Sequence, residues 1–420
     1  MMYQATKKES RFFKLLLVTI FFNIWFPKAG IKISGIPFTI GNIMFALTFI
    51  MWIFLKFKNI MKFNKTGILI LFGILYFLAR LFLSYFINLD FEHFIGFIIP
   101  LIVYPLIFYI IIDTVDSKEK VDKIVKIIVY GFFFLSIYAL MQYIFGIDKV
   151  AIPGITVNLT DYKEYGKYWF LQKANGTTVD SAKIVGTYQN GNLFGISLIL
   201  IYPLVYYYLK QNNKKNTLIV SLLLFIVCVF LTLSRACWLG IVLFIIIEII
   251  LKKSKTIGAI ISKIMIVSLC IAGIFFALNY MPSISERFFG TDAKDWISMS
   301  GRTQGIIDVF NSINDSNSIV PYIIGPQGII NYSGLAYEML PLSLFAQSGI
   351  IGVILLYAVF LKTIKDIKCN SYVSKAIRVL LIIWLIVGII ECGYWLPPAA
   401  LNIFMLIGLG YSAKELEKEK

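Results

Sequence analysis

Four arginines are the residues of this chain whose type and setting best suit chemistry. They stand in or beside apolar stretches: Arg80 in FLARLF, Arg235 in TLSRACWLG, Arg287 in ISERFF and Arg302 in SGRTQ. An arginine keeps its charge at any ordinary pH, and its planar guanidinium donates two parallel hydrogen bonds to a phosphate. Because Arg302 begins a predicted helix, free backbone N–H groups would add to anion binding there. The four residues predict a site for an anionic ligand, although any single one could instead form a structural ion pair.

Arg80 is the arginine that lies deepest within a predicted membrane-crossing helix. A charge inside such a helix is costly, so it is a functional hypothesis by default. Two structural alternatives stay open: the side chain snorkels to the outer headgroups, or it pairs with an acid such as Glu338 or Glu391.

Glu338 is the residue that we predict as a general base. It stands in AYEML at the start of an apolar helix, where partial burial would raise its pKa toward a useful range. A position favoured only by the helix dipole is the competing interpretation. His93 is the only histidine and cannot build a metal site alone, so we predict no metal and no cofactor. Walker, GxGxxG and GxSxG motifs are absent from the sequence, which argues against ATP-driven transport and serine hydrolysis.

The composition predicts an all-α polytopic membrane protein. Hydrophobic residues make up 59% of the chain, charged residues only 15%, and the mean hydropathy is +0.82. Five single cysteines, without metal or disulfide spacing, add no other framework. At about 17 to 25 apolar residues per helix, we predict about twelve membrane spans in one integral domain, 1–420. They lie near 12–27, 38–57, 66–86, 94–113, 124–146, 190–209, 217–233, 236–251, 257–280, 335–361, 376–391 and 397–412.

The distribution of positive charge predicts how the chain is oriented. If both termini are cytoplasmic, most of the 39 Lys and Arg residues fall in short inner loops, as the positive-inside rule expects. The formal net charge of +16 is then explained by an anionic inner leaflet, and no nucleic-acid partner is needed. Two long polar segments, 147–189 and 281–334, become outer loops, and loops of that size are uncommon without a function.

The first long loop carries aromatic residues that could bind a glycan. Tyr162, Tyr165 and Trp169 stand among charged residues, and such rings can stack on the faces of sugars. An amphipathic helix at the membrane surface, with the aromatics as interfacial anchors, is equally compatible with the pattern.

Several of these segments together resemble the O-antigen polymerase and O-antigen ligase superfamily. The resemblance covers roughly residues 186–365. It rests on TLSRACWLG around Arg235, SGRTQ around Arg302, the later segments IGPQG and LFAQSGIIG, and an N-x-N entry formed by Asn190 and Asn192. The pairing of the Ser-Arg motif with the later Gly-Arg is more specific than either motif alone.

The resemblance implies a type C-like membrane glycosyltransferase that uses polyprenyl-diphosphate-linked glycans on the outer face of a bacterial cytoplasmic membrane. It implies that Arg235 and Arg302 bind the diphosphate, assisted by Arg80 and Arg287, under the large outer loop 281–334. The predicted glycan-binding residues are Tyr162, Tyr165, Trp169, Asn190, Asn192 and Gln304. The partners would be lipid-linked donor and acceptor glycans and membrane lipids, and a chain-length regulator is an optional further partner.

One departure from the family's pattern favours a polymerase over a ligase. Ligases and protein O-oligosaccharyltransferases carry a histidine just before the span that begins here near Gly334, whereas this chain reads NYSGLAYE. We therefore predict a polymerase of surface polysaccharide, with Glu338 as the base. A ligase or protein O-oligosaccharyltransferase is the nearest alternative. A flippase or small-anion transporter is the alternative from another class, although no internal repeat supports it.

Overall fold

The fold is known from a computed structural model, which is mostly helical. It describes residues 2–33, 36–56, 64–85, 99–165, 173–174, 177–178, 183–188, 190–251, 307, 311, 319–325, 339–368, 371–391, 393 and 398–418. The long helices are α1 (Met2–Trp25), α2 (Ile40–Lys56), α3 (Lys65–Tyr85), α6 (Lys118–Phe145), α9 (Gly191–Gln211), α10 (Lys215–Leu231), α11 (Arg235–Leu251), α16 (Leu340–Asp366), α17 (Tyr372–Val387) and α18 (Ala399–Lys418).

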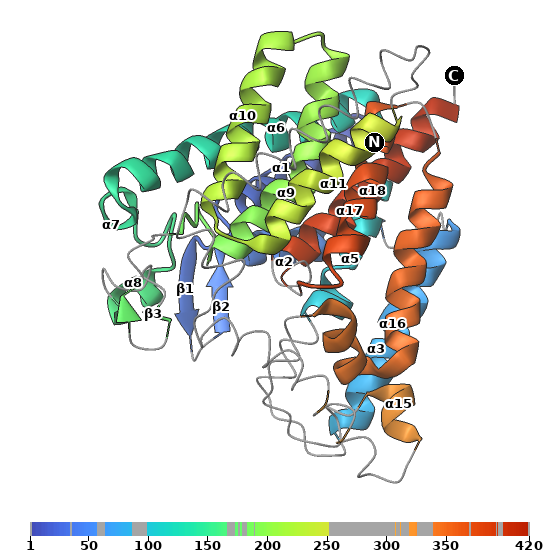
Figure 1. Ribbon diagram of the computed structural model, residues 1–420. Helices are drawn as coiled ribbons and strands as arrows, with labels where there is room; N and C mark the ends of the chain where they lie inside the picture. The colour runs from blue at the N-terminus through green and yellow to red at the C-terminus, as the bar shows by residue number, and fades with distance from the viewer. Residues whose placement is uncertain are drawn as a thin grey trace.

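Shorter elements connect these helices. They are the π-helix η2 (Ile99–Val103) and the helices α5 (Leu106–Thr114), α7 (Ile147–Val150), α8 (Leu159–Tyr165) and α15 (Val320–Ile324). Strands β1 (Gly30–Ile33) and β2 (Ile36–Thr39) form an antiparallel hairpin with Gly30 opposite Thr39, and β3 (Lys173–Ala174) pairs with β4 (Thr177–Thr178). Figure 1 shows the first hairpin beside α8, below the main bundle.

Helix α9 lies at the centre of the bundle. Its residues are almost all buried, and it packs against α6, α10, α11, α17 and α18. The rings of Tyr202 in α9 and Phe225 in α10 stack with their centroids 3.9 Å apart. Helices that are apolar all round are expected in the interior of a bundle as well as in lipid, and α9 is the interior case.

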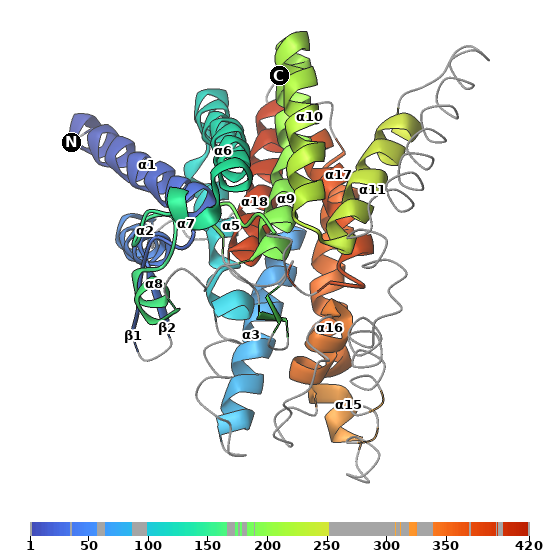
Figure 2. The same cartoon turned by 60° about the vertical axis from the view of Figure 1, so that its left-hand side comes forward.

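The helices alternate in direction, which gives the bundle two different ends. We call the basic end the one where α3, α6, α10 and α17 begin and α9, α11, α16 and α18 end. The opposite, loop end is where α9, α11 and α16 begin and α1, α6, α10 and α17 end. Figure 2 shows α9 and α10 side by side, with the α9–α10 turn at the basic end and α11 slanting away from them.

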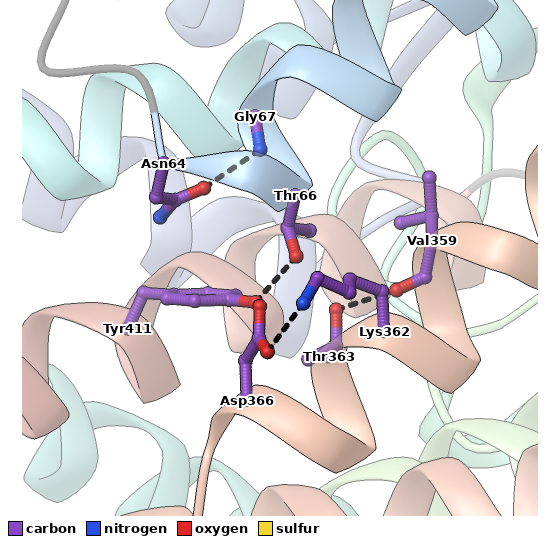
Figure 3. A network of polar contacts seen from close by, with 8 residues as sticks. All are labelled: Asn64, Thr66, Gly67, Val359, Lys362, Thr363, Asp366 and Tyr411. Atoms are coloured by element: carbon purple, nitrogen blue, oxygen red, sulfur yellow. Dashed lines mark hydrogen bonds and ion pairs between the residues drawn. The ribbon is translucent and has the colours of Figure 1, made fainter.

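A polar network ties three helices together at the basic end (Figure 3). The Tyr411 hydroxyl of α18 hydrogen-bonds the Thr66 hydroxyl of α3 and donates to a carboxylate oxygen of Asp366 in α16, at 3.2 Å. The same carboxylate pairs with Lys362 at 2.8 Å. Asn64 caps the start of α3 by accepting from the Gly67 N–H at 2.7 Å. These bonds fix the register of α3 and α16 against α18.

Helix α16 is broken inside its length. Gly349 has φ +63° and ψ −171°, a conformation that residues with a Cβ rarely adopt, so the helix consists of parts 340–348 and 350–366. The span predicted at 335–361 did not anticipate this break. A hydropathy profile does not reveal this break, because the apolar residues that follow Gly349 keep the hydropathy high across it.

The all-α membrane class is supported, whereas the number of spans is not. Three helices of the described residues are long and apolar enough to cross a membrane: Lys118–Phe145, Gly191–Gln211 and Leu340–Asp366. Shorter apolar helices cover Ile40–Leu55, Ile99–Thr114 and Lys215–Leu231. A helix overlaps each predicted span except 257–280, which lies outside the described residues. The figure of twelve spans therefore stays a prediction.

Candidate functional site

Arg235 begins α11 directly after a tight turn from α10. Leu233 has φ +54°, and the Thr232 hydroxyl donates to the Val229 carbonyl at 2.6 Å, which closes the end of α10. Trp238 stacks on Phe230 with ring centroids 4.9 Å apart and donates its indole N–H to that residue's carbonyl. The turn is thus held from both sides, and the half-buried Arg235 stands at a fixed place at the loop end.

The start of α9 lies next to the start of α11. Asn190 caps α9 by accepting from the Leu193 N–H at 2.8 Å. A Cβ built on Gly191 would lie 3.0 Å from the Thr232 carbonyl oxygen, and one built on Gly195 would lie 2.7 Å from the Cys237 sulfur. Glycine is therefore required for this close approach. Two helix starts, with their positive dipole ends and free N–H groups, accompany Arg235.

Two further charged residues lie here: Lys183, which the sequence did not single out, and Glu391, which it offered as an acid that could pair with Arg80. Lys183 and Glu391 are half-buried, and both lie close enough to the Cys237 sulfur to act on it electrostatically. The Gly393 N–H donates to a Glu391 carboxylate oxygen at 3.1 Å. Lys183 and Glu391 are some two hundred residues apart in the sequence, so no local pattern predicts that both lie near Cys237.

The start of α16 reaches the same end of the bundle. The Leu340 N–H donates to the Gly388 carbonyl of α17 at 3.2 Å. Glu338, the predicted base, lies outside the described residues. So do Arg287, Arg302, Gln304 and Trp169, and their predicted roles stay predictions.

Arg80 is buried inside the bundle, with only 2% of its surface exposed. Its guanidinium donates to the Gly325 carbonyl at 3.2 Å, and the hydroxyl of Tyr76, one turn earlier, donates to the carbonyls of Ser348 and Ile323. This side chain therefore points into the protein and does not snorkel to the lipid headgroups. Arg80 joins α3 to the residue after α15, and Tyr76 joins α3 to the break in α16, so a structural contact is the role that the geometry of Arg80 supports.

The predicted glycan-binding residues that the structure describes lie in two regions. Tyr162 of α8 packs against the small buried cluster of Ile147, Val157 and Val185, and Tyr165 ends the same helix. Asn192 accepts a weak hydrogen bond from the Cys237 thiol at 3.7 Å through its carbonyl. Asn190 and Asn192 thus lie beside Arg235, whereas the described part of α8 lies in the small unit formed with the β1–β2 hairpin.

That small unit carries an ion pair at its centre. The Lys32 ammonium lies 2.5 Å from the carboxylate of Asp161, which is fully buried. Thr160 fixes the hairpin by hydrogen bonds to the Lys32 N–H at 2.9 Å and to its carbonyl. Burial, aided by the charge of Lys32, lowers the pKa of the nearby Lys28 to about 8, while Asp161 acts in the opposite direction.

Comparisons with known proteins found no match to this chain among family models, curated proteins or solved structures. Within the part of the chain that the structure describes, no group of three or more His, Cys, Asp or Glu residues could hold a metal ion. The site is therefore defined by its own residues: Arg235, the paired helix starts, Lys183 and Glu391.

Proposed function

We propose that this protein is a membrane glycosyltransferase that joins polyprenyl-diphosphate-linked repeat units into a surface polysaccharide. The observation that carries the proposal is Arg235, held at the start of α11 beside the capped start of α9. An arginine next to two positive helix ends suits the leaving diphosphate of such a donor. The resemblance of the segments around Arg235 and Arg302 to the O-antigen polymerase and ligase superfamily supports the same assignment.

The reaction needs few protein groups because the donor is already activated. A hydroxyl of the acceptor glycan attacks the anomeric carbon of the donor, and the bond from that carbon to the diphosphate oxygen breaks. Arg235 and Arg302 neutralise the charge that develops on the departing diphosphate. Glu338 takes the hydroxyl proton, and Arg287 assists from a distance.

The setting of the reaction is also part of the proposal. The site would face outward from a bacterial cytoplasmic membrane, with both termini inside and with the segments 147–189 and 281–334 outside. Donor and acceptor would reach the site by lateral diffusion in the membrane. The missing histidine near Gly334 favours chain growth over transfer of the finished glycan by a ligase.

Transport is a second candidate function, and the break in α16 favours it. Carriers commonly bind their substrate at interrupted helices, and Gly349 interrupts α16 near the buried Arg80. A flippase for lipid-linked glycans or a small-anion carrier would use such a break. The two functions differ in their product, so one preparation can separate them.

The test uses the full chain in liposomes with its polyprenyl-diphosphate repeat unit. Polymerisation produces a ladder of glycan lengths on a gel. We expect Arg235→Ala to slow ladder formation by a factor of about 10² to 10³, the usual cost of losing one group that stabilises developing negative charge. Arg235→Lys keeps the charge but loses the paired hydrogen bonds, and we expect an intermediate rate.

Arg11→Ala is the matched control, because Arg11 is an exposed arginine of α1. It should polymerise at the wild-type rate. Glycan that crosses the bilayer without growing would make this protein a transporter and would end the catalytic assignments. An unchanged ladder in Arg235→Ala would remove Arg235 from the site even if the chain polymerises.

A further inference from the structure

A pocket of about 380 Å³ opens at the basic end of the bundle, whereas Arg235 lies at the opposite end. It lies between the last turns of α9 and α11 and the first three turns of α17. Its polar lining includes Tyr207, Lys210, Glu248, Tyr372, Lys375 and Arg378. Nothing in the proposed glycosyl transfer uses these residues.

Glu248, the one acid among the described residues of the lining, already has partners. One carboxylate oxygen of Glu248 hydrogen-bonds the Tyr207 hydroxyl, and the other lies 3.6 Å from the Lys210 ammonium. Lys210 also lies over the Tyr206 ring, 5.0 Å from its centroid, and this contact fixes its place at the rim. Glu248 therefore cannot also neutralise the two cations of α17.

Those two cations, Lys375 and Arg378, face the pocket without an acid. Within the described part of the chain neither forms a salt bridge, and the buried Arg378 Nε has no hydrogen-bond partner. A buried donor without a partner is costly, and a bound anion would remove that cost. Among the described residues of the lining, three cations face one carboxylate, which gives this part of the lining a net charge of +2.

The lining changes from charged to apolar along α17. Val379 and Ile382 follow Arg378 within about one turn, and they line the same pocket toward the middle of the bundle. Cations at the end of a helix, with apolar side chains one turn deeper, match a phosphate headgroup with its acyl chain. A free phosphate would leave that apolar part unfilled.

We propose that this pocket binds the phosphate headgroup of an anionic phospholipid from the leaflet at the basic end. Arg378 donates its paired hydrogen bonds to the phosphate, Lys375 adds charge at the rim, and the acyl chain lies along Val379 and Ile382. Basic pockets between membrane helices on the cytoplasmic side bind such headgroups. The site would couple the packing of α9, α11 and α17 to the anionic lipid content of the membrane.

The test follows thermal unfolding of the full chain in a nonionic detergent at constant ionic strength. Three additives are titrated separately: phosphatidylglycerol, phosphatidylcholine and inorganic phosphate. We expect phosphatidylglycerol to raise the unfolding temperature at a mole fraction at least tenfold lower than phosphatidylcholine. Lys375→Gln/Arg378→Gln should raise that half-saturating fraction about 25-fold, since each basic residue at an anionic lipid contributes roughly a factor of five.

Two further variants separate this pocket from general surface charge. Lys365→Gln/Lys368→Gln removes the same charge from exposed positions near the end of α16, and it should leave the titration unchanged. Glu248→Gln removes the acid of the pocket, and it should lower the half-saturating fraction severalfold. The lipid-induced shift of each variant is measured from its own unfolding temperature without lipid, so a change in basal stability does not affect the comparison.

Three outcomes would overturn the proposal. Equal loss of the phosphatidylglycerol effect in both double variants would show that only surface charge matters. Protection by inorganic phosphate, with phosphatidylglycerol no better than phosphatidylcholine, would make the site one for a soluble phosphate compound. No protection by either phosphate source would show that the pocket binds neither.

Discussion

Arg235 and Arg80 are each held in one position, the first by its neighbours in the sequence and the second by a distant segment. Arg235 stands where it does because Leu233 accepts a left-handed conformation and Trp238 bonds back to the preceding helix. Arg80 is equally fixed, but through a carbonyl of a distant segment. The first arginine borders the loop end, whereas the second is enclosed, so the first is the better candidate to meet a ligand.

The lowered pKa of Lys28 predicts how the stability of the folded chain depends on pH. Because burial lowers its pKa to about 8 from an unfolded value of about 10.5, the folded chain binds fewer protons between these pH values. Stability should therefore rise with pH in this window, by at most about 1.4 kcal/mol per pH unit, while the cost of the buried charge is fully present below pH 8.

Lys28→Met should remove the contribution of Lys28 to the pH dependence of stability and leave the contributions of the other titratable groups unchanged. The measurement is the unfolding temperature of both proteins from pH 7 to pH 10.5, plotted as a difference so that tyrosine titrations cancel. Lys163→Met, which removes an exposed lysine of α8, is the control and should follow the wild type. A constant difference for Lys28→Met across the range would mean that Lys28 does not titrate in this window.

At the scale of elements, the network in Figure 3 makes a prediction about helix packing. Tyr411→Phe removes one hydroxyl that joins α18 to both α3 and α16, while Lys362 still neutralises Asp366. We expect a loss of about 1–3 kcal/mol, the usual cost of leaving buried partners unsatisfied. It is measured as a lower apparent unfolding temperature in detergent.

Tyr143→Phe removes the hydroxyl of an exposed tyrosine of α6 and provides the comparison. The change in side-chain chemistry is identical, so only the contacts differ. If the two variants unfold at the same temperature, the Tyr411 hydroxyl does not stabilise the bundle.

The elements also show what a sequence can and cannot predict. Apolar windows overlap every long helix that the structure describes, because a helix in an apolar medium satisfies its own backbone. The short helices α7, α8 and α15 lie outside these windows. The windows missed the β1–β2 hairpin, which is short, and the break at Gly349, which only its φ reveals. They could not separate lipid-facing from interior helices, so the burial of α9 was not foreseen.

The candidate site was predictable to a smaller degree than the fold. Arg235 was predicted because it stands where one span ends and the next begins, and Asn190 because its motif resembles the family's, and the structure places both at helix starts. The proximity of Lys183 and Glu391 to Cys237 was not predicted, because only tertiary packing creates it. Tyr162 was predicted from its type alone, and its side chain contributes to a small buried cluster.

The whole molecule is asymmetric, and this asymmetry links its two proposed sites. Lys118 at the start of α6, Lys214 before α10 and Lys365 near the end of α16 lie at the basic end, whereas Arg235 and the paired helix starts lie at the loop end. If the basic end faces the cytoplasm, the phosphate pocket meets the anionic leaflet and Arg235 faces outward. Both proposals therefore require the same orientation.

Two exposed lysines can establish that orientation. Lys163 lies in α8 in the first long loop, and Lys214 lies in the α9–α10 turn at the basic end. In intact cells, a thiol reagent that cannot cross the membrane should label Lys163→Cys, whereas Lys214→Cys should react only after permeabilisation. The unsubstituted protein gives the background from its native cysteines, of which Cys228 and Cys237 are buried. The reverse labelling would place Arg235 inside and would contradict polymerisation on the outer face, because the site would then open to the wrong compartment.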